Sequence, residues 1–460
     1  MTITIHIPNH HINEIRWILG IILKEYFGLD YVIVESHLPG YRIEIGGRCL
    51  FLNDEFFCNT TNTWLKPKSL PTSTLTQWDV VTSGLSPSLI TSTIPIIFGK
   101  PGFHLDKNKN GFLNLDVIGS VFFMLSRYEE IVLSDRDKHD RFPVEASISF
   151  KAGFLERPIV DEYIEILWSA MKILWPMLER NVRQGQVIVT CDVDTPFNCL
   201  SRNFTQTMRT AIGDAVKRRD IKKAVKKIKN YLDNIGKSYR ADPEYTFDWY
   251  MDACEKKGRK SAFYFITEHS SRKMDGCYKI NEPKILELIG NIAKRGHELG
   301  VHGSYNTYRN EKQISRERRS MIEACRLAGV SPSIQGNRQH YLRWDTSITP
   351  DNLDKAGFEY DTTGAFAEMP GFRYGTSRTF PMWSWKKNDS LKLNQKPLVL
   401  MECSVISEYY MGLGYSDSAL DKMLSLKNTS MRYGGDFTIL WHNNHLTTNK
   451  DKEFFLELIQ

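Results

Sequence analysis

The chain lacks the cysteine pattern of a disulfide-stapled or zinc-ribbon protein. Its eight cysteines are scattered over 460 residues, and no two of them form a CxxC pair. Disulfide scaffolds are usually short chains with dense, regularly spaced cysteines. We therefore expect reduced thiols, most of them buried.

Long apolar runs are also missing. Runs such as residues 18–23 and 121–125 are far shorter than the ~20 apolar residues that span a bilayer. The first residues show no basic segment followed by an apolar one, which a secretory signal requires. We therefore expect a cytoplasmic protein without a membrane span.

A strong excess of one charge is absent as well. The net charge is +6, the pI is near 8.7, and 41% hydrophobic and 25% charged residues are typical of a soluble globular protein. A length of 460 residues favours two or three domains. The basic segment 217–229 is interpreted as a solvated amphipathic helix, with nucleic-acid contact as the alternative. We expect no nucleic-acid partner.

The first part of the chain has the pattern of a small α/β region. Strands are expected at residues 2–7, 31–35 and 41–52, and loops at residues 59–94, which are rich in Thr, Ser and Pro. Apolar residues at helical spacing predict helices at residues 12–27, 114–130 and 163–178. We divide this region into residues 1–94 and 95–182.

From residue 186 onward, predicted strands alternate with predicted helices. This alternation is typical of a parallel α/β sheet or barrel, so we assign residues 186–460 to one domain. The strands are expected at 187–190, 261–267, 297–302, 358–362 and 437–441, and the helices at 246–257, 282–295 and 350–356.

Polar side chains follow several of these strands. Asp192 and Asp194 come just after the first, and His302 and Asn306, four residues apart, end a later one. Catalytic residues of α/β folds lie at this edge of the sheet, and two neighbouring carboxylates are costly unless they serve a metal or a proton. Each motif alone also fits a turn or a buried structural residue.

Three further clusters complete the pattern. Residues 336–344 contain Arg338 and His340, Asp361 ends another predicted strand, and His442 follows the last one. An arginine near carboxylates can fix one of them in its ionised form. Five polar clusters, each at a strand end, indicate a common site more strongly than any one of them does.

The order of these motifs (strand-DxD, GHE-x-G-x-H, an arginine motif, GF-x-YD and a terminal strand-His) resembles the polysaccharide deacetylase family. The similarity is to the subgroup whose first motif is DVD, and it covers about residues 186–460. Residues 95–182 are similar to an accessory domain of unknown function that often precedes it. The resemblance implies a distorted (β/α) barrel after a smaller α/β accessory region.

The resemblance also implies proton-transfer roles for four residues. Asp192 would be the general base, and Arg338 would orient it. His442 would be the general acid, and Asp361 would tune it. Together they would split an acetamide into acetate and an amino sugar.

The same resemblance implies a divalent metal ion, with zinc favoured, bound by Asp194 and His302. Asn306 occupies the place where the family usually has a second histidine ligand. A neutral amide should bind the ion more weakly, and we expect Asn306→His to tighten metal binding. The partner would be an N-acetylated carbohydrate.

Two other functions stay open at this point. A non-sugar amidohydrolase could use the same motifs on another C–N bond, and a carbohydrate-binding protein with impaired catalysis would explain Asn306. The sequence does not specify the sugar, the linkage, the metal or the oligomeric state.

Overall fold

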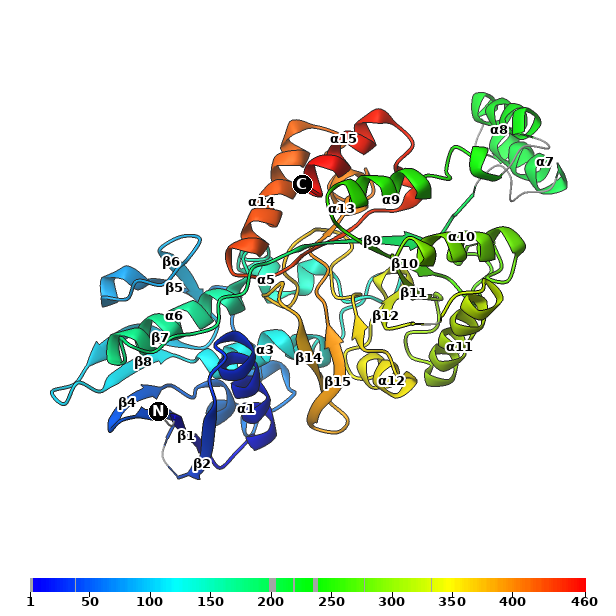
Figure 1. Cartoon of the computed structure of the whole chain (residues 1–460). Helices are drawn as coiled ribbons and strands as arrows, with labels where there is room; N and C mark the ends of the chain where they lie inside the picture. Colours follow the sequence, from blue (N-terminus) through cyan, green and yellow to red (C-terminus); the bar gives the residue numbers. More distant parts are fainter. Residues whose placement is uncertain are drawn as a thin grey trace. The chain divides into compact units, whose positions relative to one another are not determined.

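The computed structural model describes residues 3–37, 39–197, 204–217, 220–234, 239–276, 278–331 and 333–460 (Figure 1). Cys199, Cys277 and part of the basic segment 217–229 lie outside these residues. The six described cysteines are free thiols, and three of them are buried: Cys191, Cys254 and Cys325. None of the described helices has both the length and the apolar character needed to cross a bilayer.

The chain forms two compact units, and each is discontinuous in sequence. Unit 1 comprises Met1–Gln186, Leu342–Leu400 and Leu424–Thr438, and unit 2 comprises Val187–Tyr341, Met401–Met423 and Ile439–Gln460. The division into residues 1–94, 95–182 and 186–460 stays a prediction. One boundary between the two compact units falls at residue 186, but unit 1 also includes the later segments Leu342–Leu400 and Leu424–Thr438.

Unit 1 contains a six-stranded sheet in the order β2-β1-β3-β4-β8-β7. Buried and partly buried residues alternate along β1, β3 and β8, so each strand presents one face to a core. Its strands are β1 (Ile3–Pro8), β2 (Tyr31–Ser36), β3 (Tyr41–Ile45), β4 (Arg48–Leu52), β7 (Gly99–Leu105) and β8 (Gly111–Leu115).

Three helices contribute the core of unit 1, namely α1 (Ile12–Leu19), α3 (Val117–Leu125) and α6 (Ile159–Leu174) (Figure 1). They carry the helical apolar spacing that the sequence shows, and α1 continues as a π-helical segment, Gly20–Tyr26. Asp116 caps α3 by accepting from the backbone N–H of Gly119, so this helix begins later than predicted.

Two expectations for unit 1 were partly wrong. The strand expected at 41–52 is a hairpin, because Gly46 and Gly47 adopt φ of 59° and 79°, values that reverse the chain at little cost only for glycine. Residues 59–94, expected as loops, contain β5 (Thr76–Asp79) and start β6 (Thr93–Ile96), which pair antiparallel.

The later segments of unit 1 add three strands and a helix. β13 (Tyr360–Asp361) is parallel to β15 (Asp389–Gln395), which pairs antiparallel with β14 (Phe380–Ser384). Helix α12 (Thr349–Ala356) precedes β13, close to where the sequence predicts it.

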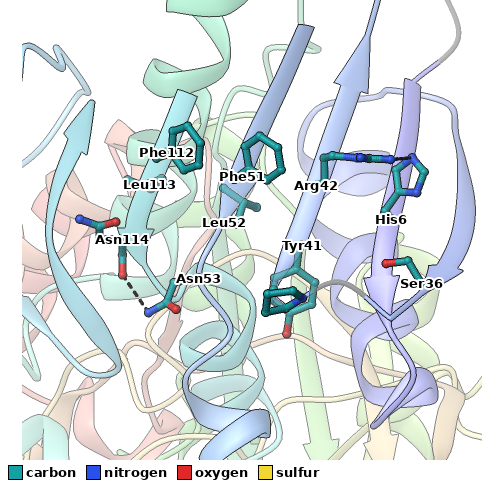
Figure 2. A pocket seen from close by; sticks show the side chains of 12 residues that line it. His6, Ser36, Tyr41, Arg42, Phe51, Leu52, Asn53, Phe112, Leu113 and Asn114 are labelled. Atoms are coloured by element: carbon teal, nitrogen blue, oxygen red, sulfur yellow. Dashed lines mark hydrogen bonds between the residues drawn. The ribbon is translucent and has the colours of Figure 1, made fainter. Parts of the chain in front are cut away.

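Unit 1 also has a cavity of about 370 Å³ over β1, β3, β4 and β8 (Figure 2). Arg42 and His6 are hydrogen-bonded at 2.8 Å at one end, and the rings of Phe51 and Phe112 stack with centroids 4.8 Å apart. None of the residues predicted for catalysis lines this cavity.

Unit 2 contains parallel strands in the order β12-β11-β10-β9. These parallel strands alternate with helices along the chain, which confirms the α/β class. Nearly every strand residue is buried, as in sheets covered on both faces. The strands are β9 (Val187–Val193), β10 (Ser261–Phe265), β11 (Glu298–Gly303) and β12 (Gly336–Gln339).

The last strand, β17 (Phe437–Leu440), runs beside β9. The Thr190 hydroxyl donates to the carbonyl of Ile439 at 2.8 Å, and the Trp441 N–H donates to the carbonyl of Thr190 at 3.0 Å. The parallel strands bring their carboxyl ends to a common edge, which therefore holds the polar residues that follow them.

Helices precede or follow each of these strands. α10 and α11 both contact β11, and α9 leads into β10 as the sequence predicts (Figure 1). The helices of this unit include α9 (Phe247–Lys256), α10 (Pro283–Lys294), α11 (Glu311–Leu327), α13 (Glu402–Ile406) and α15 (Asn449–Leu458).

Candidate active site and metal centre

Three side chains converge at the carboxyl edge of the unit 2 sheet. The potential ligand atoms of Asp194, His302 and His340 all lie within 4.8 Å of one another. Nε2 of His302 is 3.2 Å from Oδ1 of Asp194, and Nε2 of His340 is 3.6 Å from Oδ2. Two imidazoles and a carboxylate form a donor set that suits zinc and related divalent ions.

Both histidines are oriented from behind by hydrogen bonds at Nδ1. Nδ1 of His302 is 2.9 Å from the carbonyl of Arg338, and Nδ1 of His340 is 3.0 Å from Oδ1 of Asp275. Because both partners are acceptors, Nδ1 carries a proton in each ring, and Nε2 can offer a lone pair to a cation. This second hydrogen bond is typical of metal-binding histidines.

Asp275 is itself held in place by the loop around it. Its carboxylate accepts backbone N–H groups from Ser270, Ser271 and Tyr305 at 2.7–2.9 Å. Burial alone would raise the pKa of Asp275, but the hydrogen bonds from His340 and from these amides lower it below its usual value. Asp275 is therefore an ionised, rigid partner for His340.

The residues present fit a bound cation. Oδ1 of Asp194 is buried and has no hydrogen-bond partner among the described residues. It faces Nε2 of His302, which is also an acceptor when Nδ1 carries the proton. Two acceptors facing each other at this distance are unfavourable unless a proton or a cation lies between them.

Asp192 lies beside this group and is held by Arg338. One carboxylate oxygen accepts from the Arg338 guanidinium at 2.9 Å, and the other is 3.6 Å from Nε2 of His302. The same guanidinium nitrogen donates to the Thr190 hydroxyl, and the guanidinium stacks over the Tyr264 ring at 4.9 Å. Arg338 is fully buried, so it orients Asp192 rigidly.

His442 approaches the same group from the turn after β17. Its Nε2 is 3.7 Å from Oδ2 of Asp194, and its Nδ1 is 2.6 Å from Oε1 of Glu402. Burial alone would lower the pKa of His442, but the Glu402 carboxylate raises it well above its usual value. His442 is therefore a charged proton donor whose Nε2 faces the metal centre.

The structure thus brings together most of the residues that the sequence singled out, although their chemical roles stay predictions. They come from four separate segments of unit 2, and their polar atoms lie near a common centre. The residues brought together are Asp192, Asp194, His302, Arg338 and His442.

Asn306 takes a different position from the one its predicted role requires. Its side chain is exposed, and its amide donates to the carbonyl of Ser270 at 3.1 Å. The chain leaves β11 at Gly303 and continues as a turn, so a spacing of four residues does not place Asn306 beside His302. A ligand role for Asn306 stays a prediction, and the geometry favours His340 as the third donor.

Asp361 belongs to unit 1, where its carboxylate accepts from the backbone N–H and the hydroxyl of Thr363, both at 2.7 Å. Its predicted role as the tuner of the acid stays a prediction. Glu402 makes the contact with Nδ1 of His442.

Sequence reasoning missed the roles of His340, Asp275 and Glu402. His340 stands in the arginine motif but was given no function, and Glu402 comes directly after a short strand, β16 (Leu400–Met401). The signal that could have found Glu402 is the same one that found Asp192, a polar residue at the end of a buried strand.

Comparison with known proteins gives a match for the N-terminal part of the chain. Residues 3–176 match a family of unknown function (DUF7033). No curated protein matches the chain.

Solved structures of deacetylases and of an allantoinase are similar to part of the chain. A protein from Mycobacterium smegmatis assigned as a polysaccharide deacetylase has 17% identity and a TM-score of 0.39, covering 61% of this chain and 84% of that one. A family 4 carbohydrate esterase from Streptomyces lividans, solved with acetate, has 10% identity and a TM-score of 0.28, covering 60% and 90%. The allantoinase PuuE has 15% identity and a TM-score of 0.31, covering 48% and 70%.

Proposed function

We propose that this chain is a metal-dependent hydrolase that removes acetyl groups from an N-acetylated amino sugar or a glycan containing one. The observation that supports this proposal is the convergence of a carboxylate and an imidazole on one candidate metal centre. Oδ2 of Asp192 lies 3.6 Å from Nε2 of His302, and Nε2 of His442 lies 3.7 Å from Oδ2 of Asp194.

Asp194, His302 and His340 would hold a divalent ion, for which we propose zinc, and this ion would supply the positive charge that polarises the scissile carbonyl. His302 and His340 present Nε2 to it because the Arg338 carbonyl and Asp275 occupy their Nδ1 positions.

Asp192 is the proposed general base. One of its oxygens is fixed by Arg338, so the other is free to take the proton of the attacking water. Arg338 also prevents rotation of the carboxylate, because it bridges Asp192 and Thr190.

His442 is the proposed general acid. Glu402 keeps a proton on Nδ1, so Nε2 carries the second proton of the charged ring and can pass it to the departing amine. The products are acetate and a free amino group.

The substrate class and the location of the protein are also proposals. The order of the motifs, with its resemblance to polysaccharide deacetylases, supports an amino sugar over other amides. We propose that the enzyme acts in the cytoplasm on a precursor of a glycan, and cell fractionation tests this location directly.

The test is a screen for acetate release from N-acetylated sugars by the purified full-length protein with zinc, cobalt or nickel. We expect release from at least one N-acetylhexosamine compound and loss of that release with a chelator. Hydrolysis of cyclic amides without acetate release would instead assign a non-sugar amidohydrolase. Sugar binding without any turnover would assign a carbohydrate-binding protein.

A further inference from the structure

A second group of potential metal ligands surrounds Glu402, the residue that contacts His442. It contains the side chains of Glu402, Cys403, His442 and His445, whose ligand atoms lie within 4.8 Å of one another. Glu402 and Cys403 begin α13, and His445 ends the short turn after β17. None of these four residues belongs to the Asp194 group, although Nε2 of His442 lies 3.7 Å from Oδ2 of Asp194.

We propose that Glu402, Cys403 and His445 form a second cation site, specific for a zinc-class divalent ion. A cation there would compete with the general acid for Glu402, so that excess metal would inhibit the enzyme. The cation site itself stands independently, and only the inhibition rests on the proposed deacetylase function.

The distances within this group are close to those of a tetrahedral zinc site. Sγ of Cys403 is 3.4 Å from Nδ1 of His445 and 3.7 Å from Oε1 of Glu402. Zinc bonds of about 2.0–2.3 Å place neighbouring donors roughly 3.3–3.7 Å apart. Nδ1 of His445 is 2.8 Å from Oε1 of Glu402, so binding requires these two atoms to separate by about half an ångström.

The chemistry of the donors also points to a cation. A thiolate with an imidazole and a carboxylate favours zinc over the hard ions magnesium and calcium. Oε2 of Glu402 is buried and has no hydrogen-bond partner among the described residues, which is costly for a carboxylate. A cation bound to this carboxylate would offset the cost of burying its negative charge.

The group is open enough for an ion to enter. The His445 side chain is 41% exposed, and Cys403 is half-buried. The Glu402 side chain is only 2% exposed, so its carboxylate lies at the buried end of the site, and the other two ligands lie nearer the surface.

The two sites share Glu402. Its Oε1 accepts from Nδ1 of His442 at 2.6 Å, the contact that orients the general acid. A cation bound to that oxygen withdraws electron density from it and weakens its hydrogen bond with Nδ1 of His442. Occupation of the second site therefore weakens the contact that fixes the ring of the proton donor and sustains its charge.

The experiment is a titration of the metal-free, full-length protein with cobalt, followed by the near-ultraviolet band of thiolate-to-cobalt charge transfer. We expect this band in the wild type and in Cys49→Ser, a matched control at another half-buried thiol. We expect its loss in Cys403→Ser and a weakened band in His445→Asn. A wild type without the band, or a band that survives in Cys403→Ser, overturns the proposal.

Two further measurements separate this proposal from the deacetylase assignment. The band should persist in His302→Ala, which removes a ligand of the first site only, so it reports the second site even if no activity is found. If the enzyme is active, the zinc concentration that inhibits it should rise at least tenfold in Cys403→Ser, since ligand loss exceeds the ~10–100-fold cost of outer-shell changes. Equal inhibition of both proteins would disprove the regulatory part.

Discussion

His442 and Glu402 are joined through Nδ1 and Oε1 at 2.6 Å, although 40 residues separate them in the chain. The carboxylate is buried, which would raise its pKa, but the charges and hydrogen bonds of His442 and His445 together hold the pKa of Glu402 below its usual value. The pair therefore acts as a unit, in which Glu402 fixes the orientation and the charge of the imidazole.

Glu402→Gln should lower kcat by about 10²–10⁴-fold with little change in KM, because a neutral amide no longer stabilises the charged acid. Steady-state kinetics on the best substrate of the acetate screen measures this change. The matched control is Glu408→Gln, an exposed residue shortly after α13, which should behave like the wild type. A raised KM at constant kcat would contradict the assignment of Glu402 to the acid.

Asp192→Asn should abolish turnover and leave substrate binding intact, because the amide cannot accept the proton of water but still fits beside Arg338. The expected loss in kcat is about 10²–10⁴-fold. Equilibrium binding of the substrate to the variant, compared with turnover, separates the two effects. Residual turnover near the wild-type level would exclude Asp192 as the base.

His340→Ala should weaken metal binding much more than Asn306→Ala does. His340 faces Asp194 through Nε2, whereas the amide of Asn306 is bonded to Ser270 at the surface. Isothermal titration of zinc into the metal-free variants measures both affinities. Asn306→His tests the ligand role predicted from the sequence: tighter binding would place residue 306 in the ligand shell after all.

Asp275→Asn should reduce metal affinity by about 10–100-fold, because His340 would lose the charged acceptor that orients its ring. The same titration measures the effect, and circular dichroism checks that the loop and the fold survive. An affinity equal to that of the wild type would show that Asp275 only supports the loop through Ser270, Ser271 and Tyr305.

A buried ion-pair network in unit 1 should make stability depend on pH. Burial raises the pKa of Glu130, but Arg373 and Arg127 outweigh it and hold the pKa at about 2, against 4.5 for a free glutamate. The stabilisation is therefore fully present above pH 4.5 and is lost as the pH falls from 4.5 toward 2.

Glu130→Gln should lower the free energy of unfolding by roughly 3 kcal/mol at neutral pH, because it leaves two arginines buried without their shared carboxylate. Its difference from the wild type should shrink below pH 4.5. Urea unfolding over a pH series measures this, with exposed Glu145→Gln as the control. A difference that is constant with pH would show that Glu130 does not act through its charge.

Much of the fold is readable from local patterns. The strands at 187–193 and 261–265 are largely apolar, and the helices between the strands of unit 2 carry apolar residues at helical spacing. These features depend on neighbours in the chain, so the sequence predicts them. Boundaries such as the hairpin at Gly46-Gly47 depend on a local backbone reversal, and here the single predicted strand was too long.

The residues of the candidate site also fall into two groups, those that the local sequence indicates and those that only the tertiary structure reveals. Asp192, Asp194, His302 and His442 are each recognisable as a polar residue after an apolar strand, a property of the local sequence. The proximity of His340 to Asp194 and His302, and the pairing of Glu402 with His442, were decided only by the tertiary structure. They depend on which strands are neighbours and where each turn directs its side chains, as when Thr190 meets Ile439 across 249 residues. The packing of the whole sheet decides which strands are neighbours, and a short stretch of sequence does not predict this packing.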